Sequence, residues 1–283
     1  MSDRFDSMNE DIGRPNVRDD DFGERFYYNK ITFSDIFVPG TSKNGLSSFI
    51  ASDQQFLDAR LGIIKKLAYV GEVLLSICEF KIQPFYVGKD NVLSLSGREQ
   101  IGRSDRTMNM ANELIQDWGT QHPSSIATDG KYAYGFDARQ GIAWRYATNG
   151  LTEISEYKQV LEFNALGKDF IAISPKNNDV LGIFDREFKC YLITFPDITG
   201  RSAATISFDE PKNGWNTYLS HLPEYYGIVG QRLVSFQDGA LWVHESDNVP
   251  RSNFYGVQYS SEVDVVANRH PRATKMYFNI DIQ

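Results

Sequence analysis

The fold of this chain is decided by four neighbouring segments: Gly119-Thr-Gln-His-Pro-Ser-Ser-Ile126, Tyr132-Ala-Tyr-Gly-Phe-Asp137, Gly141-Ile-Ala-Trp-Arg-Tyr146 and Asn149-Gly-Leu-Thr-Glu-Ile-Ser155. Turn sequences separate them at Asp129-Gly130, 138–141 and Asn149-Gly150. Glycine-containing turns of this kind supply the positive φ that tight hairpins need. Apolar residues alternate along each segment, which is the period of a half-buried strand. The stretch therefore predicts about four short antiparallel strands within about 35–40 residues, the size of one β-propeller blade.

Paired strands recur on the C-terminal side of this predicted blade. The predicted pairs are 170–174 with 180–184, 189–195 with 204–208, 231–236 with 240–244, and 254–259 with 262–267, and a further strand follows at 275–282. Strand pairs at this spacing, with no long helix predicted between them, are typical of an all-β protein. The repeats are loose rather than identical. We therefore expect a β-propeller-like array of about four to six short antiparallel blades.

The N-terminal third contains further extended segments. The sequence predicts extended chain over 26–50, a short helix or turn at 53–60, a hairpin from 62 to 80 that turns at Gly71, and another strand at 81–87. Residues 95–118 are polar and are predicted to be a long connection. A connection of that length is unusual in a compact domain unless it has a function.

The charge distribution divides the chain into two predicted regions. Residues 1–25 contain eight acidic and four basic side chains, so they hold −4 of the net charge of −8. With few apolar residues to bury, they are expected to form a flexible, extended acidic N-terminal arm. The arm is either a solvated tail or a segment that orders on a neighbouring subunit. Residues 26–283 are the predicted propeller-like domain, and because strands are predicted almost to the last residue, we expect an incomplete domain or a fragment of a longer protein.

The overall composition excludes some classes of protein. The negative net charge argues against a surface built to bind free duplex DNA, which requires an excess of Lys and Arg. The longest apolar stretch, near 67–77, is too short to span a membrane. The two cysteines, Cys78 and Cys190, lie within apolar runs and are predicted to be buried small hydrophobic residues, although a disulfide between them stays open.

No motif for catalysis, nucleotide binding or metal binding occurs in the sequence. The four histidines, His122, His221, His244 and His270, are spread over different predicted strand pairs. Sequence reasoning therefore predicts no enzyme activity, no cofactor and no metal ion.

Carboxylates and tryptophans each have two readings. Carboxylates recur at the ends of predicted strands: Asp129, Asp137, Asp185, Asp209, Glu210 and Asp238. A pair of them across a cleft would suit glycoside hydrolysis, but Asp also closes β-turns by accepting hydrogen bonds from its own backbone, and we favour that role. The tryptophans are Trp118, Trp144, Trp215 and Trp242. They are predicted to be packing residues rather than platforms for sugars.

An ordered set of short motifs resembles one family of virus proteins. The matching segments are 25–34, Lys43-Asn-Gly-Leu-Ser-Ser-Phe49, 61–67 with 73–75, 122–126, 149–151, 154–155, 207–210 with Trp215, 239–244, 254–256, and 268–271 with Lys275. Together they cover roughly 25–280, and they resemble tail proteins of short-tailed bacteriophages, in particular the muzzle or "stabilization" proteins of crAss-like phages. Members of that family are usually far longer than this chain.

The resemblance implies a structural role in a virion. Such a protein would be made in the cytoplasm of a bacterial host and would form a homo-oligomeric ring at the genome exit channel of the phage tail. It would contribute to tail assembly and to DNA retention and ejection. The implied partners are other tail and portal-complex proteins, with at most non-specific contact with genomic DNA.

A candidate subunit interface follows from the same resemblance and from the basic residues of the polar connection. Its residues are Arg25, Ser34, Asn44, Gly45, Leu46, Ser47, Phe49, Arg98, Arg103 and Arg106. The loop at 44–49 is expected to close the propeller or to contact a neighbour. The three arginines at 98–106 either touch phosphate or an acidic partner, or form a solvated face.

An alternative function belongs to a different class. The chain would then be a propeller glycosidase or a carbohydrate-binding module that acts on a bacterial surface glycan. The feature that separates the two is a pair of carboxylates about 5–9 Å apart in one pocket.

Overall fold

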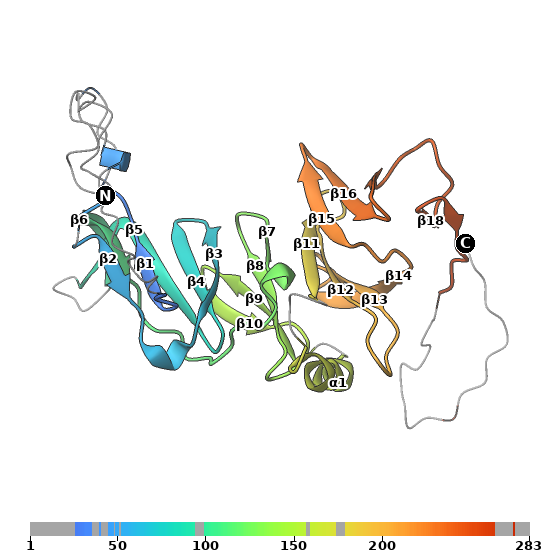
Figure 1. Cartoon of the computed structure of the whole chain (residues 1–283), viewed down its shortest axis with the longest axis horizontal. Helices are drawn as coiled ribbons and strands as arrows, with labels where there is room; N and C mark the ends of the chain where they lie inside the picture. The colour runs from blue at the N-terminus through green and yellow to red at the C-terminus, as the bar shows by residue number, and fades with distance from the viewer. Residues whose placement is uncertain are drawn as a thin grey trace, which may run out of the picture.

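The computed structural model describes most of the chain between residues 26 and 263. The described residues are 26–35, 40, 45–47, 49–50, 52–93, 99–156, 159–173, 179–263 and 274, with the backbone alone described at 89–93 and 99–106. The predicted arm, 1–25, lies outside them. The described residues are mostly β structure in several small antiparallel sheets, which confirms the all-β prediction (Figure 1).

A small two-stranded sheet begins the described chain. It consists of β1 (Lys30–Thr32) and β2 (Gln54–Phe56), which pair antiparallel. Two 3-10 helices accompany it, η2 (Gly45–Ser47) and η3 (Ala59–Leu61). Asp58 caps η3, because its Oδ1 accepts a hydrogen bond from the backbone N–H of Arg60 at 2.9 Å. The segment predicted as a helix or turn at 53–60 is therefore part strand and part 3-10 turn.

Sheet I has four strands in chain order: β3 (Ile64–Val70), β4 (Val73–Cys78), β5 (Ile82–Leu93) and β6 (Glu99–Met110). The hairpin predicted through Gly71 is confirmed, since β3 and β4 pair on either side of it. The polar connection predicted at 95–118 is wrong over 99–110, which form β6 and pair with β5. An edge strand uses its backbone on one side only and needs no apolar pattern, so the polar sequence of β6 did not reveal it.

Sheet II is the four-stranded sheet that corresponds to the blade predicted at 119–155. A 3-10 helix, η4 (Pro123–Ser125), leads into it. Its strands are β7 (Ala127–Thr128), β8 (Ala133–Asp137), β9 (Ile142–Ala147) and β10 (Gly150–Glu153), paired antiparallel in chain order. The strands predicted at 132–137, 141–146 and 149–155 and all three predicted turns are confirmed. The strand predicted at 119–126 is wrong, because this segment contains η4 and the first strand of the sheet, β7, begins only at Ala127.

The one α-helix among the described residues lies between sheets II and III and was not predicted. Helix α1 (Val160–Phe170) buries Phe163, Leu166 and Phe170, which are spaced three and four residues apart on one face. The strand predicted at 170–174 is therefore wrong. Its apolar residues include the end of the helical stripe, and the predicted partner, 180–184, pairs instead with the following strand.

Sheets III and IV follow. Sheet III contains β11 (Leu181–Asp185), β12 (Cys190–Phe195), β13 (Ala204–Asp209) and β14 (Gly214–Leu219). Sheet IV contains β15 (Tyr225–Val229), β16 (Arg232–Gln237) and β17 (Ala240–Val243). The predicted pairs 189–195 with 204–208 and 231–236 with 240–244 are confirmed.

A short hairpin follows sheet IV. It pairs β18 (Asn253–Phe254) with β19 (Val257–Gln258). The single strand predicted at 254–259 is wrong, because the chain already reverses between β18 and β19, where Tyr255 and Gly256 both have positive φ. Most of its predicted partner, 262–267, lies outside the described residues. The strand predicted at 275–282 lies outside the described residues.

The four sheets stack face to face in chain order (Figure 1). At the first junction, Leu75 and Ile77 of sheet I pack against Trp144 and Tyr146 of sheet II. The other face of sheet II packs on α1 and sheet III through a cluster that includes Tyr134, Phe136, Phe163, Tyr191, Phe195 and Trp215. The far face of sheet III meets sheet IV through Cys190, Leu192, Tyr226 and Leu233. The row stays open, with sheets I and IV at opposite ends.

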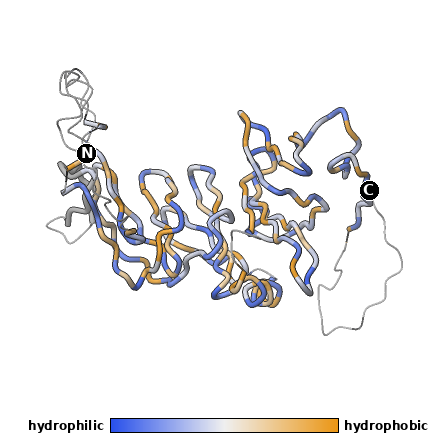
Figure 2. Tube along the Cα trace, in the orientation of Figure 1, coloured by the Kyte–Doolittle hydropathy of each residue, from blue (hydrophilic) through white to orange (hydrophobic). Residues whose placement is uncertain are grey.

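Stacking on both faces explains the sequence of the inner strands. Apolar and polar residues are interspersed along the chain (Figure 2), yet every residue of β12 is buried. Tyr191 and Ile193 point toward sheet II, whereas Cys190 and Leu192 point toward sheet IV. β12 is therefore apolar at every position except Thr194, as expected when neither face of a strand meets water.

Three hairpins turn in the same way. In each, Oδ1 of an aspartate at the strand end accepts hydrogen bonds from the backbone ahead of it: Asp137 from Arg139 and Gln140, Asp185 from Glu187 and Phe188, and Asp209 from Lys212. The residue four positions after each aspartate has positive φ: 66° at Gly141, 53° at Lys189 and 49° at Asn213. The prediction that these aspartates close turns is confirmed, and Asp129 does the same for Lys131 and Tyr132.

Replacing Lys189 by glycine is expected to stabilise the protein. A side chain at positive φ strains the backbone, so Lys189→Gly should raise the free energy of unfolding by about 0.5–1 kcal/mol. Urea unfolding at constant m-value measures this change. Asn213→Gly is the matched control and should gain less, because asparagine tolerates the left-handed region better than lysine. A loss of stability in Lys189→Gly would contradict the argument.

Candidate functional site

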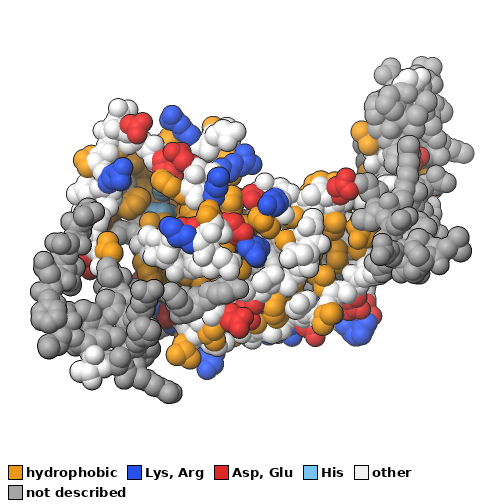
Figure 3. Space-filling view, turned by 180° about the vertical axis from the view of Figure 1, so that it is seen from behind, with side chains coloured by type: hydrophobic (Ala, Val, Ile, Leu, Met, Phe, Trp, Pro, Cys, Tyr) orange, Lys and Arg blue, Asp and Glu red, His pale blue; other side chains and the backbone are white. Residues whose placement is uncertain are grey.

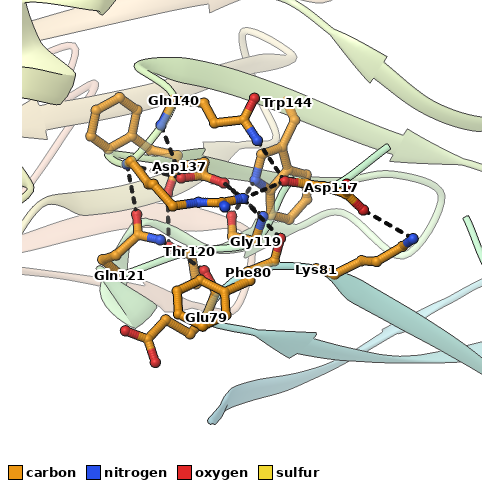
Figure 4. A network of polar contacts seen from close by, with 12 residues as sticks. Glu79, Phe80, Lys81, Asp117, Gly119, Thr120, Gln121, Asp137, Gln140 and Trp144 are labelled. Carbon is orange, nitrogen blue, oxygen red and sulfur yellow. Dashed lines mark hydrogen bonds and ion pairs between the residues drawn. The ribbon is translucent and has the colours of Figure 1, made fainter. Parts of the chain in front are cut away.

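A polar network ties sheet I to sheet II (Figure 4). Asp137 is fully buried at its centre, and its Oδ2 accepts a hydrogen bond from the backbone N–H of Gly119 at 2.9 Å. The guanidinium of Arg139 donates to the backbone oxygens of Asp117 at 2.7 Å and Phe80 at 3.3 Å. Burial raises the pKa of Asp137, and the hydrogen bonds that its carboxylate accepts act in the opposite direction.

The other polar groups of this network also bind groups of the fold. Trp144 donates its Nε1–H to the backbone oxygen of Gly119 at 2.9 Å, and Lys81 pairs with Glu113 and Asp117 at 2.8 and 3.0 Å. Figure 4 shows the carboxylate of Asp137 bound to the backbone of Gly119. Arg139 likewise binds backbone oxygens of neighbouring turns. The network thus fixes how the two sheets sit together.

A second cluster joins sheet II to sheet III. Glu210 accepts hydrogen bonds from Arg145 at 2.5 Å and from the hydroxyl of Tyr134 at 3.0 Å. The prediction that Glu210 closes a turn is wrong, because its side chain reaches across the junction to Arg145 and Tyr134 instead. Burial, with the nearby carboxylate of Glu210, raises the pKa of Tyr134 and keeps its hydroxyl a donor.

His122 holds helix α1 against sheet II. Its side chain is fully buried, with Nε2 at 3.0 Å from the backbone oxygen of Phe170 and Nδ1 at 3.0 Å from Oδ1 of Asp179. Both ring nitrogens therefore have structural partners. Through these two contacts the ring connects η4 to the end of α1 and to the chain before β11.

A buried histidine pair lies on one face of sheet IV. The rings of His221 and His244 are 4.9 Å apart, and Nε2 of His221 lies 3.0 Å from the hydroxyl of Tyr226. Nδ1 of His221 is buried, and among the described residues it has no hydrogen-bond partner. Desolvation, with the neighbouring His244, lowers the pKa of His221 to about 3, and desolvation also lowers the pKa of His244.

Ser235 beside this pair has the geometry of an activated serine but no access. Its Oγ lies 2.7 Å from Nε2 of His244 and 3.0 Å from the hydroxyl of Tyr255. A serine next to a histidine is the start of a nucleophilic pair. Ser235 has no exposed surface, however, so a substrate carbonyl would have no path to its Oγ. The arrangement is a buried hydrogen-bonded cluster.

The cysteines behave as the sequence predicts. Cys78 and Cys190 are both free and buried, so the disulfide left open by the sequence does not form. Burial raises the pKa of Cys190 to about 11, which keeps the thiol protonated. Within the described part of the chain, no three His, Cys, Asp or Glu side chains are placed to hold a metal ion.

A shallow cavity lies where sheet I meets the end of sheet II. It encloses about 240 Å³ and is lined by Val73, Pro84, Tyr86, Ala111, Asn112, Leu114, Tyr146, Thr148, Asn149 and Gly150. Burial raises the pKa of Tyr146, and the nearby Tyr86 adds to that rise, so its phenol is neutral. The described lining combines two aromatic rings with amide and hydroxyl groups and contains no carboxylate.

Sheet IV leaves much of its outer face exposed, and we call this the C-face, although Val234 at the centre of this face is only 3% exposed. Its exposed apolar side chains are Tyr225, Val229, Phe236, Leu241 and Val243, with exposed fractions from 41% to 65%. Tyr225, Phe236 and Leu241 are directly opposite one another on β15, β16 and β17, so they form one row on one face. The inner sheets II and III bury both of their faces, and the C-face is the exception to that rule.

Sheet I also has an outer face with exposed apolar residues, which we call the N-face. Tyr69, Leu74, Phe85 and Met110 are opposite one another on β3 to β6. The β1–β2 sheet covers the middle of this row, where Phe85 is buried, but Tyr69 and Met110 at its two ends stay 54% and 46% exposed. Exposed Tyr27 and Phe56 of the covering sheet extend the apolar surface, with ring centroids 6.0 Å apart.

Only part of the candidate interface predicted from the sequence lies among residues whose side chains the structure describes. Gly45 is buried within η2, Leu46 beside it is exposed, and Ser34, Ser47 and Phe49 are half-buried. Arg25, Asn44 and Arg98 lie outside the described residues, and the side chains of Arg103 and Arg106 on β6 are not described. Sequence reasoning missed both apolar faces. For the C-face the only signal was the alternation of Tyr225, Gly227 and Val229, in a segment not predicted as a strand.

The surface charge and the hydropathy of the helices were compared with what nucleic-acid binding and membrane spanning require. On the face drawn in Figure 3, acidic and basic side chains are interspersed with apolar ones rather than gathered into a surface of one sign. Such a face gives little electrostatic attraction for a nucleic acid. No helix in the described part of the chain is both long and apolar enough to cross a membrane.

Compared with protein-family models and with curated protein sequences, the chain matches none.

Proposed function

We propose that the chain is a non-enzymatic structural subunit of a bacteriophage tail, in which sheets I to IV act as the blades of a β-propeller-like array. The observation that carries this proposal is the open row of face-to-face sheets, which ends in an apolar face on each side. A row that ends in this way is suited to assembly, because large exposed apolar surfaces mark sites of protein association.

Two further observations support a structural role. The acidic, basic and nucleophilic side chains at the described junctions bind neighbouring turns, strands or one another, as Asp137, Glu210 and Ser235 do. The motif order of the sequence resembles that of the muzzle proteins of crAss-like phages. We therefore propose a ring at the genome exit channel that contributes to tail assembly and to DNA retention and ejection, with other tail and portal-complex proteins as neighbours.

Quantitative mass spectrometry of gradient-purified phage particles from the source culture tests the proposal. We expect peptides of this chain in several copies per particle, at a constant ratio to the major capsid protein across the gradient peak. A host protein of similar abundance in the lysate is the control for carry-over. Presence in the lysate but absence from the particle peak would exclude a tail subunit.

The cavity between Tyr86 and Tyr146 favours a second candidate function, binding of a neutral saccharide. Aromatic rings offer faces to the C–H groups of a sugar, while amide and hydroxyl groups hydrogen-bond its hydroxyls. The volume of about 240 Å³ suits a ligand about the size of one sugar ring. Because the described lining has no carboxylate, the cavity suits a carbohydrate-binding module rather than a glycosidase, which needs two carboxylates.

Tyr86→Ala tests this second function. In NMR titrations of the full chain with oligosaccharides from the host capsule, wild type should show saturable shifts that Tyr86→Ala weakens by tenfold or more, or about 1.4 kcal/mol. Tyr218→Ala, which removes an exposed tyrosine from sheet III, should bind as wild type does. Equal binding by wild type and Tyr86→Ala would remove the cavity from consideration.

A further inference from the structure

Both ends of the row of sheets expose apolar side chains to water. Each inner sheet buries apolar side chains on both sides. At one end the C-face has no further sheet on it, and at the other end the β1–β2 sheet covers only the middle of the N-face and leaves its two ends exposed. On the C-face, the ring of Tyr225 lies 6.5 Å from that of Phe236, with Val229, Leu241 and Val243 on the same side of the sheet. Five large apolar side chains exposed together on three short strands form a patch of the kind that marks an interface.

We propose that the C-face of one copy docks on the N-face of a second copy of this chain, so that copies associate head to tail. This inference rests on the proposed function and names the surfaces that would build its ring. The occupant follows from continuity: a second copy placed on the C-face extends the row by one more sheet-on-sheet junction, of the type that already forms between I and II, II and III, and III and IV.

The composition of the two faces fits this pairing. Both present aromatic and aliphatic side chains at their exposed positions: Tyr225, Val229 and Phe236 on one, and Tyr27, Tyr69 and Met110 on the other. Mixed aromatic and methionine surfaces are enriched in protein interfaces. The faces are different patches, so the contact is heterologous, and a heterologous contact builds a ring where the rotation between copies closes and a filament where it does not.

A pair of single variants tests the geometry of the contact. Val229→Asp puts a charge on the C-face, and Tyr69→Asp puts one on the N-face, at positions 65% and 54% exposed. With multi-angle light scattering after gel filtration of the full chain, wild type should form oligomers and each variant alone should be monomeric. A mixture of the two should form a 1:1 dimer, because one intact C-face and one intact N-face remain between them.

Controls separate this result from misfolding and from other contacts. Ile115→Asp changes a side chain that is 92% exposed and lies on neither face, so it should oligomerise as wild type does. Thermal unfolding of all variants checks that they fold. A variant that remains oligomeric alone, or a mixture that stays monomeric, would overturn the head-to-tail contact, and so would a wild-type chain that is monomeric at all concentrations.

The test also separates this inference from the proposed function. If particles contain the chain but purified wild type does not self-associate through these faces, the contact is wrong and the tail role stands. If wild type associates head to tail and particles lack the chain, the contact stands and the tail role is wrong.

Discussion

Gly182→Ala is expected to destabilise the protein by about 3 kcal/mol, because it would force sheets II and III apart. Gly182 lies on β11, which faces η4. A Cβ at this position would lie 2.0 Å from the backbone oxygen of Ser125 and 2.9 Å from the hydroxyl of Tyr191. The tighter of these contacts is to backbone, which cannot rotate away as the end of a flexible side chain could. The same approach carries the 2.7 Å hydrogen bond from Tyr191 to Ser125, which would be lost as well.

Thermal unfolding followed by circular dichroism measures this effect. A loss of about 3 kcal/mol should lower Tm by about 6–12 °C in a domain of this size. Gly214→Ala is the matched control, since it also changes a strand glycine but its Cβ would meet no atom closer than 3.9 Å. That variant should stay within about 0.5 kcal/mol of wild type. If Gly182→Ala unfolds at the wild-type temperature, the close contact between β11 and η4 does not exist in solution.

The sequence predicted the hairpins where turn chemistry and strand pattern agree. Asp129-Gly130 and Asn149-Gly150 mark turns by residue type, and the strands between them alternate or are apolar, so sheet II could be assigned almost strand by strand. The pair β16–β17 was predicted for the same reason, since Asp238-Gly239 joins two apolar segments. Local signals of this kind are short-range and survive without knowledge of the tertiary structure.

Elements that depend on tertiary partners were missed. β6 is polar because it is an edge strand. Helix α1 was not predicted, and its last residue, Phe170, was assigned to a strand at 170–174 because it continues into an apolar run. The helix becomes favourable only because Phe163 and Phe170 meet Phe195 of sheet III, at ring centroid distances of 6.2 and 5.4 Å. These contacts join residues that are 25 or more positions apart, so the pattern of the 11 residues of the helix alone could not reveal them.

The candidate surfaces could not be predicted either. The C-face consists of alternate residues on three strands, and their apolar character does not say which face of a sheet will be covered. The sequence of β16 is compatible with a strand buried on either side, and only the stacking of sheet III on Tyr226 and Leu233 identifies the face that remains exposed. Which face of sheet IV is exposed therefore depends on how the sheets stack, and the sequence of a single strand does not determine it.

Acidification is expected to destabilise sheet IV through His221. The unfolded histidine has a pKa near 6.5, and in the folded protein burial lowers the pKa of His221 to about 3. Between these values the unfolded state binds one more proton than the folded state, so stability falls as pH falls below 6.5. From pH 7 to pH 5 the contribution of His221 should drop by about 2 kcal/mol. Its surroundings offer no compensating anion among the described contacts, which are His244, Tyr226 and Phe254.

Urea unfolding of wild type and His221→Gln at pH 7 and pH 5 isolates this contribution. Other groups titrate in the same range, and the raised pKa values of Asp137 and Glu245 act in the opposite direction, so the difference between the two proteins is the quantity to measure. His221→Gln should be less stable than wild type at pH 7, because glutamine replaces a well-packed ring, and the gap should close by about 2 kcal/mol at pH 5. A gap that stays constant with pH would mean that His221 takes up its proton within the folded protein, which requires water or an anion at Nδ1.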